Sequence, residues 1–424
     1  MGIRYAPAIL IGRLVRVLAR LRKPGGGSAV PGLVVNKIAP GFLTTTLNSF
    51  PEGLVIVSGS SGKSTTTKML VAALRGHGKK VFTNPSTANI TQGLTSALLE
   101  KANLAGRIDC DIAVLEMDEG HGALIADGLT PRVVVLTNVM VDQIDRFHDS
   151  HMVASMLAKI ARRSSEAVVI NADDAFLAEL AAGLPESVSV ERFGVSADVL
   201  DANPRGLGLA TMTSHRMPAA SGVVVRTVSG RSSEMTIDGG PMTTVRLCGR
   251  GTHYAVDAAA AMAGARAILG ERFEPAIASS TIGSIPPVFG RGETMQVRGT
   301  MVEFVLVQNP ASFQLNIDNL DPDTEQILFA IGSDVRDPSY FWPVDTSGLR
   351  RVDVVSGSKA DELALQLSYD NVAIGQVVHD LGRAVDEFLA LPAPSKGIKT
   401  VIFSADSMRR TRAHLGLSAL EAPE

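Results

Sequence analysis

Residues 54–67, LVIVSGSSGKSTTT, decide the fold of the first half of this chain. The apolar run 54–57 has the length of a buried strand, and a helical pattern begins at Lys63. The glycines between them let the backbone turn tightly, so that successive N–H groups converge on phosphate oxygens at the positive end of the helix. Lys63 would reach the terminal phosphates of a nucleoside triphosphate, and the hydroxyl of Ser64 or Thr65 would bind Mg²⁺.

The loop itself consists of Gly59, Ser60, Ser61 and Gly62. Its spacing, G-x-x-G-K-[ST], is shorter than that of the usual P-loop, which has four residues between the glycines. The alternative interpretation is a plain glycine turn with an exposed lysine. Because the loop lies directly between a strand and a helix, we predict that residues 59–65 bind ATP.

The composition indicates a multidomain globular protein. A chain of 424 residues exceeds one ordinary core, and its 45% hydrophobic and 20% charged residues are typical of soluble domains. The net charge of −3 argues against a dedicated nucleic-acid binder. The two cysteines, Cys110 and Cys248, form neither a disulfide framework nor a four-cysteine metal site. A reducing cytoplasm is therefore the simplest compartment.

The N-terminal segment 6–21 is apolar but is interrupted at helical spacing by Arg13, Arg16 and Arg20. It is too short and too charged to span a membrane, and it lacks the uninterrupted apolar core of a signal peptide. We expect a basic amphipathic helix that either packs on the first domain or rests on an anionic membrane surface. Residues 23–28, KPGGGS, form a flexible break after it.

From residue 54 onward, short apolar runs alternate with helical patterns, which predicts a parallel sheet covered by helices on both faces. Expected strands are 54–57, 80–83, 112–116, 133–137 and 167–170, with helices at 63–75 and 91–101. A loop-rich β insertion follows at about 194–246, and an alanine-rich helix at 254–269 returns to the core. A second α/β unit has expected strands at 302–307, 326–330, 351–355 and 399–403, and expected helices at 360–367 and 375–391.

These patterns divide the chain into three parts: a helix and lead-in at 1–50, a central domain at 51–285 and a smaller α/β domain at 286–424. In parallel sheets, ligands bind beyond the carboxyl ends of the strands. Glu116 ends one strand of the central domain and is followed by Asp118 and Glu119, so we predict that Glu116 ligates Mg²⁺. A solvated acidic loop is the alternative.

Further polar residues follow the next strands. Thr137 and Asn138 end one strand, and we expect Asn138 to bind the nucleotide. Asp142 and Asp145 follow at helical spacing, and their carboxylates would orient Mg²⁺ or adenosine or simply cap a helix. His148 alone is a weak signal. The polar loop 171–174 can reach the same crevice.

In this order, GSSGKSTTT, LEMDE, TNVMVDQID and INADD resemble the central ATPase domain of the Mur ligase superfamily, which also contains folylpolyglutamate synthase. The second half narrows the resemblance. FGRGE around Arg291, VLVQNPASFQ, FAIGSDVRDPSYFW and VVSGSKADELALQL are similar to the C-terminal domain of the MurT family, the ligase-like subunits of lipid II isoglutaminyl synthases. The segment VPGLVVNKIAPGFL before the P-loop matches as well.

The resemblance implies an α/β fold with a Mur ligase-like P-loop ATPase domain and a smaller C-terminal α/β domain. It also implies a reaction: ATP activates the α-carboxyl of D-glutamate in the lipid II stem peptide as an acyl phosphate, and ammonia from a GatD-like glutaminase partner converts it to D-isoglutamine. Lys63, Glu116 and Mg²⁺ would serve the phosphoryl transfer, and Arg291 would contact the nucleotide. Asp337, with Asp345 in reserve, would be the aspartate lent to the glutaminase's Cys-His pair.

Several positions depart from the family pattern. Members commonly carry a four-cysteine zinc ribbon where residues 193–246 lie here, and this segment has no cysteine, so we expect no zinc. The family's lysine before Asn-Pro is Gln308, its helix asparagines are Tyr254 and Asp257, and its Trp-Asp pair is Trp342-Pro343. Lys159 lies near the offset of the carbamoylated lysine of related ligases, with a surface lysine as the alternative.

Two other functions compete with amidation. One is an amino-acid-adding ligase of the folylpolyglutamate synthase type, which acts without a glutaminase. The other is a nucleotide-binding scaffold that has lost catalysis. The departures from the family pattern at Gln308, Tyr254 and Pro343 are consistent with it. The intact Lys63, Glu116 and Arg291 count against the scaffold.

Overall fold

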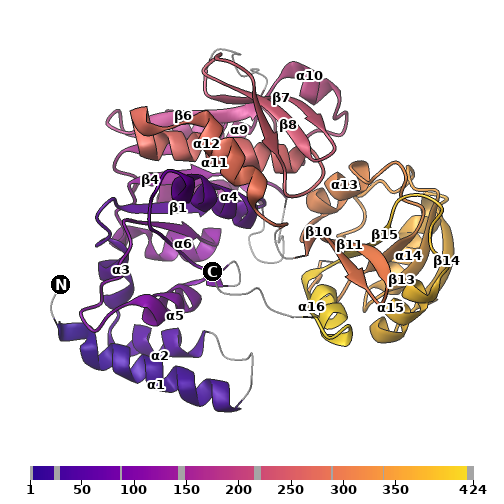
Figure 1. Ribbon diagram of the computed structural model, residues 1–424, viewed down its shortest axis with the longest axis horizontal. Coiled ribbons are helices and arrows are strands. Elements are labelled where there is room, and N and C mark those ends of the chain that lie inside the picture. Colours follow the sequence, from indigo (N-terminus) through magenta and orange to yellow (C-terminus); the bar gives the residue numbers. More distant parts are fainter. Residues whose placement is uncertain are drawn as a thin grey trace.

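The computed structural model describes residues 3–22, 29–85, 88–141, 149–213, 221–287, 290–337 and 339–417. Its strands form two sheets, which Figure 1 shows as two bodies side by side. The first sheet has the order β2-β3-β1-β4-β5-β6-β7-β8-β9 and the second β10-β11-β15-β12-β13-β14. We propose a boundary between the bodies near residue 286.

The first sheet confirms the expected parallel arrangement. Strands β1 to β7 pair in parallel with one another. Strands β8 and β9 add antiparallel pairs at one edge. Its strands are β1 (Leu54–Ser58), β2 (Val81–Thr83), β3 (Ile112–Glu116), β4 (Val133–Leu136), β5 (Ala167–Asn171), β6 (Ser189–Val195), β7 (Val223–Ser229), β8 (Ser232–Ile237) and β9 (Thr243–Arg246). The segment expected as a β insertion thus prolongs the main sheet.

Helices cover both faces of this sheet because the central strands are apolar on both sides. Val55 and Val57 of β1 face one core, and Leu54 and Ile56 face the other. The first core contains α4 (Lys63–Gly76), α11 (Thr252–Leu269) and α12 (Pro275–Ser284). The second contains α1 (Ala6–Arg22), α2 (Val30–Ile38), α3 (Phe42–Leu47), α5 (Thr91–Lys101), α8 (Ser150–Ala161) and α9 (Ala175–Ala182).

Short helices complete the first body. They are η1 (Ile3–Tyr5), α6 (Glu119–Ile125), η3 (Ala126–Gly128), α10 (Ala197–Asp201) and η4 (Gly270–Arg272). Of these, α6 matters most for the site, since it begins directly after β3 and brings its first-turn acid, Glu119, toward the glycine loop.

The second sheet is parallel except for one antiparallel hairpin at its edge. Its strands are β10 (Arg291–Val297), β11 (Thr300–Leu306), β12 (Ile327–Ala330), β13 (Arg351–Ser356), β14 (Ala373–Val378) and β15 (Lys399–Phe403). Its helices are α13 (Pro310–Asp318), α14 (Ala360–Tyr369), α15 (Leu381–Ala390) and α16 (Ala405–His414). The buried ammonium of Lys399 donates to the carbonyls of Phe388, Leu389 and Leu391 and so caps the end of α15.

One element of this half differs from expectation. The single helix expected over 375–391 is wrong in its first part, because β14 ends at Val378 and α15 begins only at Leu381. As an edge strand with mostly exposed side chains, β14 lacks the buried apolar face by which a strand is recognised. Strand β10, with the polar sequence RGETMQV, was not expected at all.

Candidate functional site

The glycine loop connects β1 to α4 in a backbone conformation that requires glycine at two positions. Gly59 has φ +134° and Gly62 has φ +79°. A Cβ atom at Gly59 would overlap the hydroxyl of Thr137, and one at Gly62 would overlap the carboxylate of Asp257. The loop is therefore enclosed by the end of β4 and by α11, and both glycines are needed for close approach.

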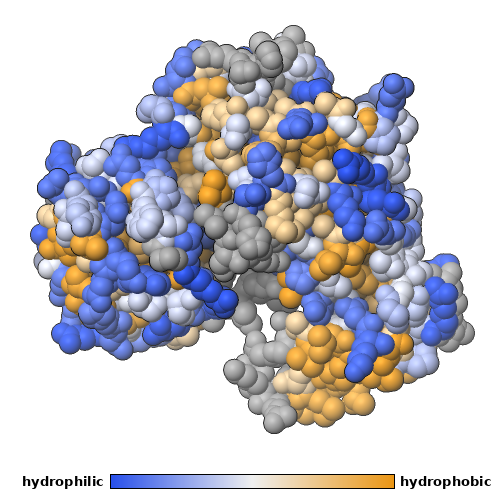
Figure 2. All heavy atoms as spheres, turned by 180° about the vertical axis from the view of Figure 1, so that it is seen from behind, coloured by the Kyte–Doolittle hydropathy of each residue, from blue (hydrophilic) through white to orange (hydrophobic). Residues whose placement is uncertain are grey.

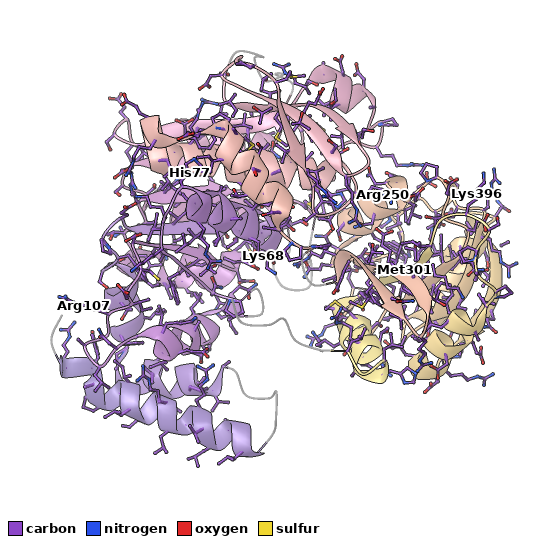
Figure 3. The ribbon with its side chains drawn as sticks, in the orientation of Figure 1. Lys68, His77, Arg107, Arg250, Met301 and Lys396 are labelled. Carbon is purple, nitrogen blue, oxygen red and sulfur yellow. The ribbon has the colours of Figure 1, made fainter. Side chains whose placement is uncertain are left out.

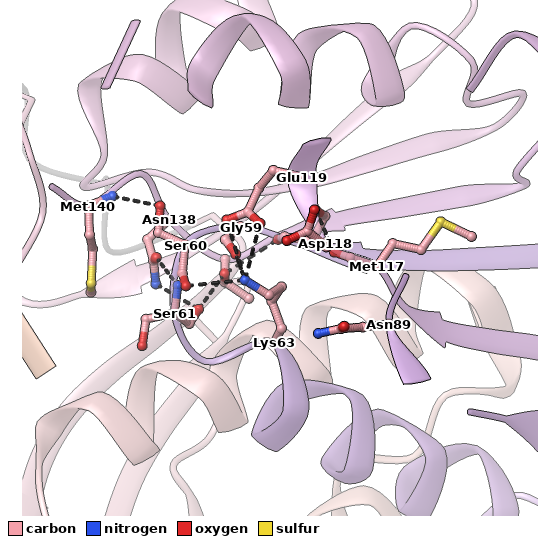
Figure 4. A network of polar contacts seen from close by, with 12 residues as sticks. Gly59, Ser60, Ser61, Lys63, Asn89, Met117, Asp118, Glu119, Asn138 and Met140 are labelled. Atoms are coloured by element: carbon pink, nitrogen blue, oxygen red, sulfur yellow. Dashed lines mark hydrogen bonds and ion pairs between the residues drawn. The ribbon is translucent and has the colours of Figure 1, made fainter. Parts of the chain in front are cut away.

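Two side chains after β4 hold this loop in place (Figure 4). The backbone N–H of Ser61 donates to Asn138 Oδ1 at 2.9 Å, and Asn138 Nδ2 donates back to the Ser61 carbonyl at 3.2 Å. Thr137 Oγ1 donates to the same carbonyl at 2.6 Å. We infer that Asn138, expected as a nucleotide ligand, acts mainly by bracing the loop.

Lys63 folds back over the loop at the start of α4. Its ammonium donates to the carbonyls of Gly59 and Ser60, and it lies 3.3 and 3.4 Å from the two carboxylate oxygens of Glu119 (Figure 4). Glu119 is only 2% exposed. The position of Lys63 fits a role in phosphate binding, and Glu119 is a partner that the sequence did not single out.

Glu116 lies at the end of β3, with its side chain buried toward the loop. Its carboxylate accepts hydrogen bonds from Asn89 Nδ2 at 3.1 Å and from the side chain of Ser64. Burial raises the pKa of Glu116, while Arg291 and Lys63 act in the opposite direction. The structure thus brings together the two residues expected to ligate Mg²⁺.

Two more charged residues reach this place from distant parts of the chain. Asp257 of α11 is buried against Gly62, and burial raises its pKa to about 8 despite Arg291 and a hydrogen bond with Thr65. Arg291, the first residue of β10, comes from the second sheet and donates to Gln308 Oε1 at 3.2 Å. The guanidinium of Arg291, from the second body, therefore interacts electrostatically with Glu116 and Asp257 of the first body.

These residues line a cleft of about 320 Å³ between the two bodies. The first body contributes residues 60–65, Glu116, Asn138, His253, Tyr254 and Asp257, and the second contributes Arg291, Gln308, Ser312, Asn316, Met408 and Arg409. A glycine loop at a helix N-terminus, a lysine, and a hydroxyl beside a carboxylate are the donor set for a triphosphate with Mg²⁺. The residues present fit ATP and Mg²⁺, and we propose that Ser64 and Glu116 would hold the metal.

Other acidic candidates serve local structure. Asp118 caps α6 by accepting from the His121 N–H at 3.1 Å, and it also lines the cleft. Asp173 accepts from the Val195 N–H at 2.9 Å, and Asp174 accepts from the Val139 N–H at 2.6 Å. Asn171, at the end of the same strand, does line the cleft.

Asp142, Asp145 and His148 lie outside the described residues. Lys159 lies on α8, where it pairs with Asp127 at 3.2 Å and is 46% exposed at its side chain. Among the described residues, no three His, Cys, Asp or Glu side chains are grouped as a metal site. Cys110 is partly buried and Cys248 is buried, and both are free thiols.

The loop after β12 carries the residues expected to serve a partner. Asp337 Oδ1 accepts from the N–H and the hydroxyl of Ser339 at 2.8 and 2.7 Å. Trp342 is 76% exposed, whereas its neighbours Tyr340 and Phe341 are buried in the core of their own domain. Asp345 is bound to Ser347 and to Arg205 of the first body.

Ion pairs also join the two bodies. Arg205 reaches Asp318 at 2.8 Å as well as Asp345, and Arg250, which Figure 3 places beside the second body, pairs with Asp321. These pairs are partly exposed, so each contributes little by itself. They lie along a second, larger and more polar cleft of about 1250 Å³.

Comparison with known families separates the chain into two matched segments. Residues 57–262 match the Mur ligase middle domain, and residues 306–403 match the MurT ligase C-terminal domain. The glycine loop from Ser60 onward, Glu116 and Asp257 fall within the first segment, and Asp337 falls within the second. Arg291 lies between them.

Individual relatives include MurT subunits. The lipid II isoglutaminyl synthase subunit MurT of Streptococcus pneumoniae is 34% identical over 172 residues, which is 40% of this chain and 37% of that protein. The MurT subunit of Staphylococcus aureus strain COL is 28% identical over 42% of this chain and 39% of that protein. The aligned part of the chain thus spans less than two fifths of the length of either relative.

Solved structures extend the likeness of fold to nearly the whole chain. The MurF ligase of Thermotoga maritima in complex with ADP superposes with a TM-score of 0.64 at 19% identity, covering 88% of this chain and 82% of that one. MurF from Acinetobacter baumannii gives a TM-score of 0.67 at 16% identity, covering 91% and 80%. The α/β fold is that of the Mur ligases.

Proposed function

We propose, for a chain that joins a Mur ligase middle domain to a MurT ligase C-terminal domain, that it is the ATP-dependent subunit of an amidating ligase acting on lipid II. One observation carries the proposal: Lys63, the Ser64–Glu116 pair and Arg291 meet in a single cleft between these two domains. Such a cleft holds a triphosphate at one wall and leaves the other wall for the group that it activates.

The chemistry that this cleft would perform starts from an unreactive carboxylate. The α-carboxylate of D-glutamate attacks the γ-phosphorus of ATP, so that a new O–P bond forms while the bond to ADP breaks. Ammonia then attacks the acyl carbon, inorganic phosphate leaves, and one proton is lost as the amide forms. Positioning and charge neutralisation supply most of the acceleration in such phosphoryl transfers.

Each residue would have a distinct part in this reaction. Lys63 would move from Glu119 to the β- and γ-phosphates, and the N–H groups at the start of α4 would bind their oxygens. Ser64 and Glu116 would hold Mg²⁺, which neutralises charge that develops on the phosphates. Arg291, brought in by the second body, would neutralise the acyl phosphate as it forms.

Ammonia would come from a GatD-like glutaminase partner in the cytoplasm. The exposed Trp342, together with Asp337 on the same loop, supports a contact there, because exposed aromatic side chains are frequent anchors of interfaces. Asp337 would orient the histidine of the partner, which keeps the catalytic cysteine as a thiolate. The serine contacts of Asp337 would then exchange for the partner's imidazole.

The experiment is reconstitution with a glutaminase of this class. The complex is expected to release phosphate from ATP only when lipid II and either glutamine or ammonium are present, and mass spectrometry should show a loss of about 1 Da per amidated stem. ATP turnover that requires an added amino acid instead would show an amino-acid-adding ligase. ATP binding without turnover under any of these conditions would show a scaffold.

A further inference from the structure

Helix α1 packs on the first body with its apolar side turned outward. Apolar side chains recur along it at spacings that place them on one helix face, and they are between 43% and 78% exposed: Leu10, Ile11, Leu14, Val17, Leu18 and Leu21. A surface helix of a globular protein normally turns this stripe toward the core. Helix α1 buries Ala8 and Ile9 in the core, but it leaves this longer apolar stripe exposed.

The side of α1 that faces the protein carries Ala8 and Ile9 in its first turns, and small and charged residues further along. A Cβ at Gly12 would lie only 2.7 and 2.8 Å from Val35 and Leu99, so the helix touches α2 and α5 closely. Arg13 donates to the carbonyls of Leu99 and Ala102 at the end of α5, where a cation is favourable. Arg16 pairs with Glu100 of the same helix. These contacts fix the rotation of α1, so the outward apolar stripe is a defined feature.

Helix α2 enlarges the apolar surface. Val30, Leu33 and Ile38 are 44%, 57% and 50% exposed. Figure 2 shows the hydrophobic side chains gathered over the end of the molecule formed by these two helices. A continuous apolar patch on a soluble domain marks a surface that is covered by something else. We call this surface, the exposed apolar residues of α1 and α2, the outer face.

The charge around the outer face points to an anionic partner. The first 51 residues contain seven Lys and Arg and no Asp or Glu, although the whole chain has a net charge of −3. Arg4 and Lys37 are exposed, and Figure 3 shows Arg107 near the start of α1. The nearby acid Glu100 is neutralised by Arg16.

The side chains of the outer face distinguish a bilayer from a protein partner. In the described parts of α1 and α2, the large exposed apolar residues are only Leu, Ile and Val, whereas protein interfaces are enriched in Trp, Tyr and Arg anchors. Among the described helices, none is long and apolar enough to cross a bilayer. A helix with an apolar face and basic flanks instead lies in the plane of the interface.

We propose that the outer face docks the protein on the surface of an anionic phospholipid bilayer. The Leu, Ile and Val side chains enter the boundary between headgroups and acyl chains, and the basic residues lie among the headgroup phosphates. This attachment needs neither nucleotide nor amidation. It therefore stands or falls independently of the function proposed above.

The test is flotation of the full-length protein with vesicles of phosphatidylcholine alone or mixed with phosphatidylglycerol. We expect flotation with the anionic vesicles, weakened by high salt, and little with the neutral ones. The double variant Leu14→Glu/Leu18→Glu should lower the partition more than about tenfold, since it removes two apolar contacts. Lys37→Gln should lower it about fivefold on anionic vesicles only.

The matched control is Leu365→Glu on α14, because Leu365 is 57% exposed, close to the 59% of Leu14, and lies in the other body. It should float like the wild type, and all variants should keep the wild-type melting temperature. Wild-type protein that stays at the bottom of the gradient with anionic vesicles would overturn the proposal. Equal losses of flotation in the outer-face variants and in the Leu365→Glu control would overturn it too. So would light scattering that shows a dimer for the wild type and a monomer for the double variant, if the protein does not bind vesicles.

Discussion

Replacing Asp257 by asparagine should change how the stability of the first body depends on pH. The carboxyl of Asp257 is buried between Gly62 and α4, and burial raises its pKa from 3.8 to about 8. The folded state therefore favours the neutral acid, whereas the unfolded chain favours the carboxylate in the same pH range. Asparagine has nearly the same shape and has no charge to bury.

The sign of the effect follows from proton binding. Between pH 3.8 and about 8 the folded state binds the proton that the unfolded state releases, so stability is lost as pH rises through this window. At ~1.4 kcal/mol for each pH unit, the full difference corresponds to at most ~6 kcal/mol. Asp257→Asn removes this loss, and its gain in melting temperature over the wild type should grow from pH 5 to pH 8 and then level off.

Thermal unfolding of both proteins across this pH range measures the effect, since other titrating groups cancel in the difference. Asp238→Asn is the matched control. Arg266 lowers the pKa of Asp238, so its contribution is present throughout the range and is lost only in acid. Its replacement should shift the melting temperature by a constant amount. Parallel curves for Asp257→Asn and the wild type would refute the reasoning.

Four further outcomes are expected. Lys63→Ala should reduce ATP turnover more than about a hundredfold, because it removes charge stabilisation at the transferring phosphoryl group, whereas Lys159→Ala should keep wild-type phosphate release. Lys63→Ala should also lower the melting temperature, because it leaves the buried carboxylate of Glu119 without its cation. Glu116→Gln should raise the Mg²⁺ concentration needed for half-maximal turnover more than it weakens ADP binding in calorimetry, and an unchanged Mg²⁺ titration would exclude it as a ligand. Elemental analysis of the purified protein should find no stoichiometric zinc, because two isolated cysteines cannot build a thiolate site. Asp337→Asn should slow glutamine hydrolysis by the complex and spare ammonium-dependent amidation, and equal losses with both ammonia sources would place Asp337 in the ligase centre instead.

The sequence predicted the parts of the site that are local in the chain. The loop from Gly59 to Lys63 was recognisable because a strand, two glycines and a helix follow one another without interruption. Glu116 was recognisable because it ends an apolar run. In each case the neighbours in sequence are also the neighbours in space.

Long-range contacts left no such signal. Glu119 pairs with Lys63 across 56 residues, and Asp257 meets Gly62 from a helix much later in the chain. Arg291 had to be taken from the family resemblance, since strand β10 is polar and carries no buried pattern of its own. The rotation of α1 was also undecided, because the sequence shows an amphipathic helix without showing which side the rest of the protein covers.

The ion pair between Lys63 and Glu119 has a thermodynamic consequence. When phosphate oxygens bind Lys63, the buried carboxylate of Glu119 would lose its cation, and so would a second buried acid, Glu116, which also interacts with Lys63. That loss makes binding of a bare triphosphate costly, and a divalent ion arriving with it removes the cost. In the proposed site, nucleotide and Mg²⁺ would thus be linked ligands, and linkage is reciprocal: the factor by which the metal tightens nucleotide binding would also be the factor by which the nucleotide tightens metal binding.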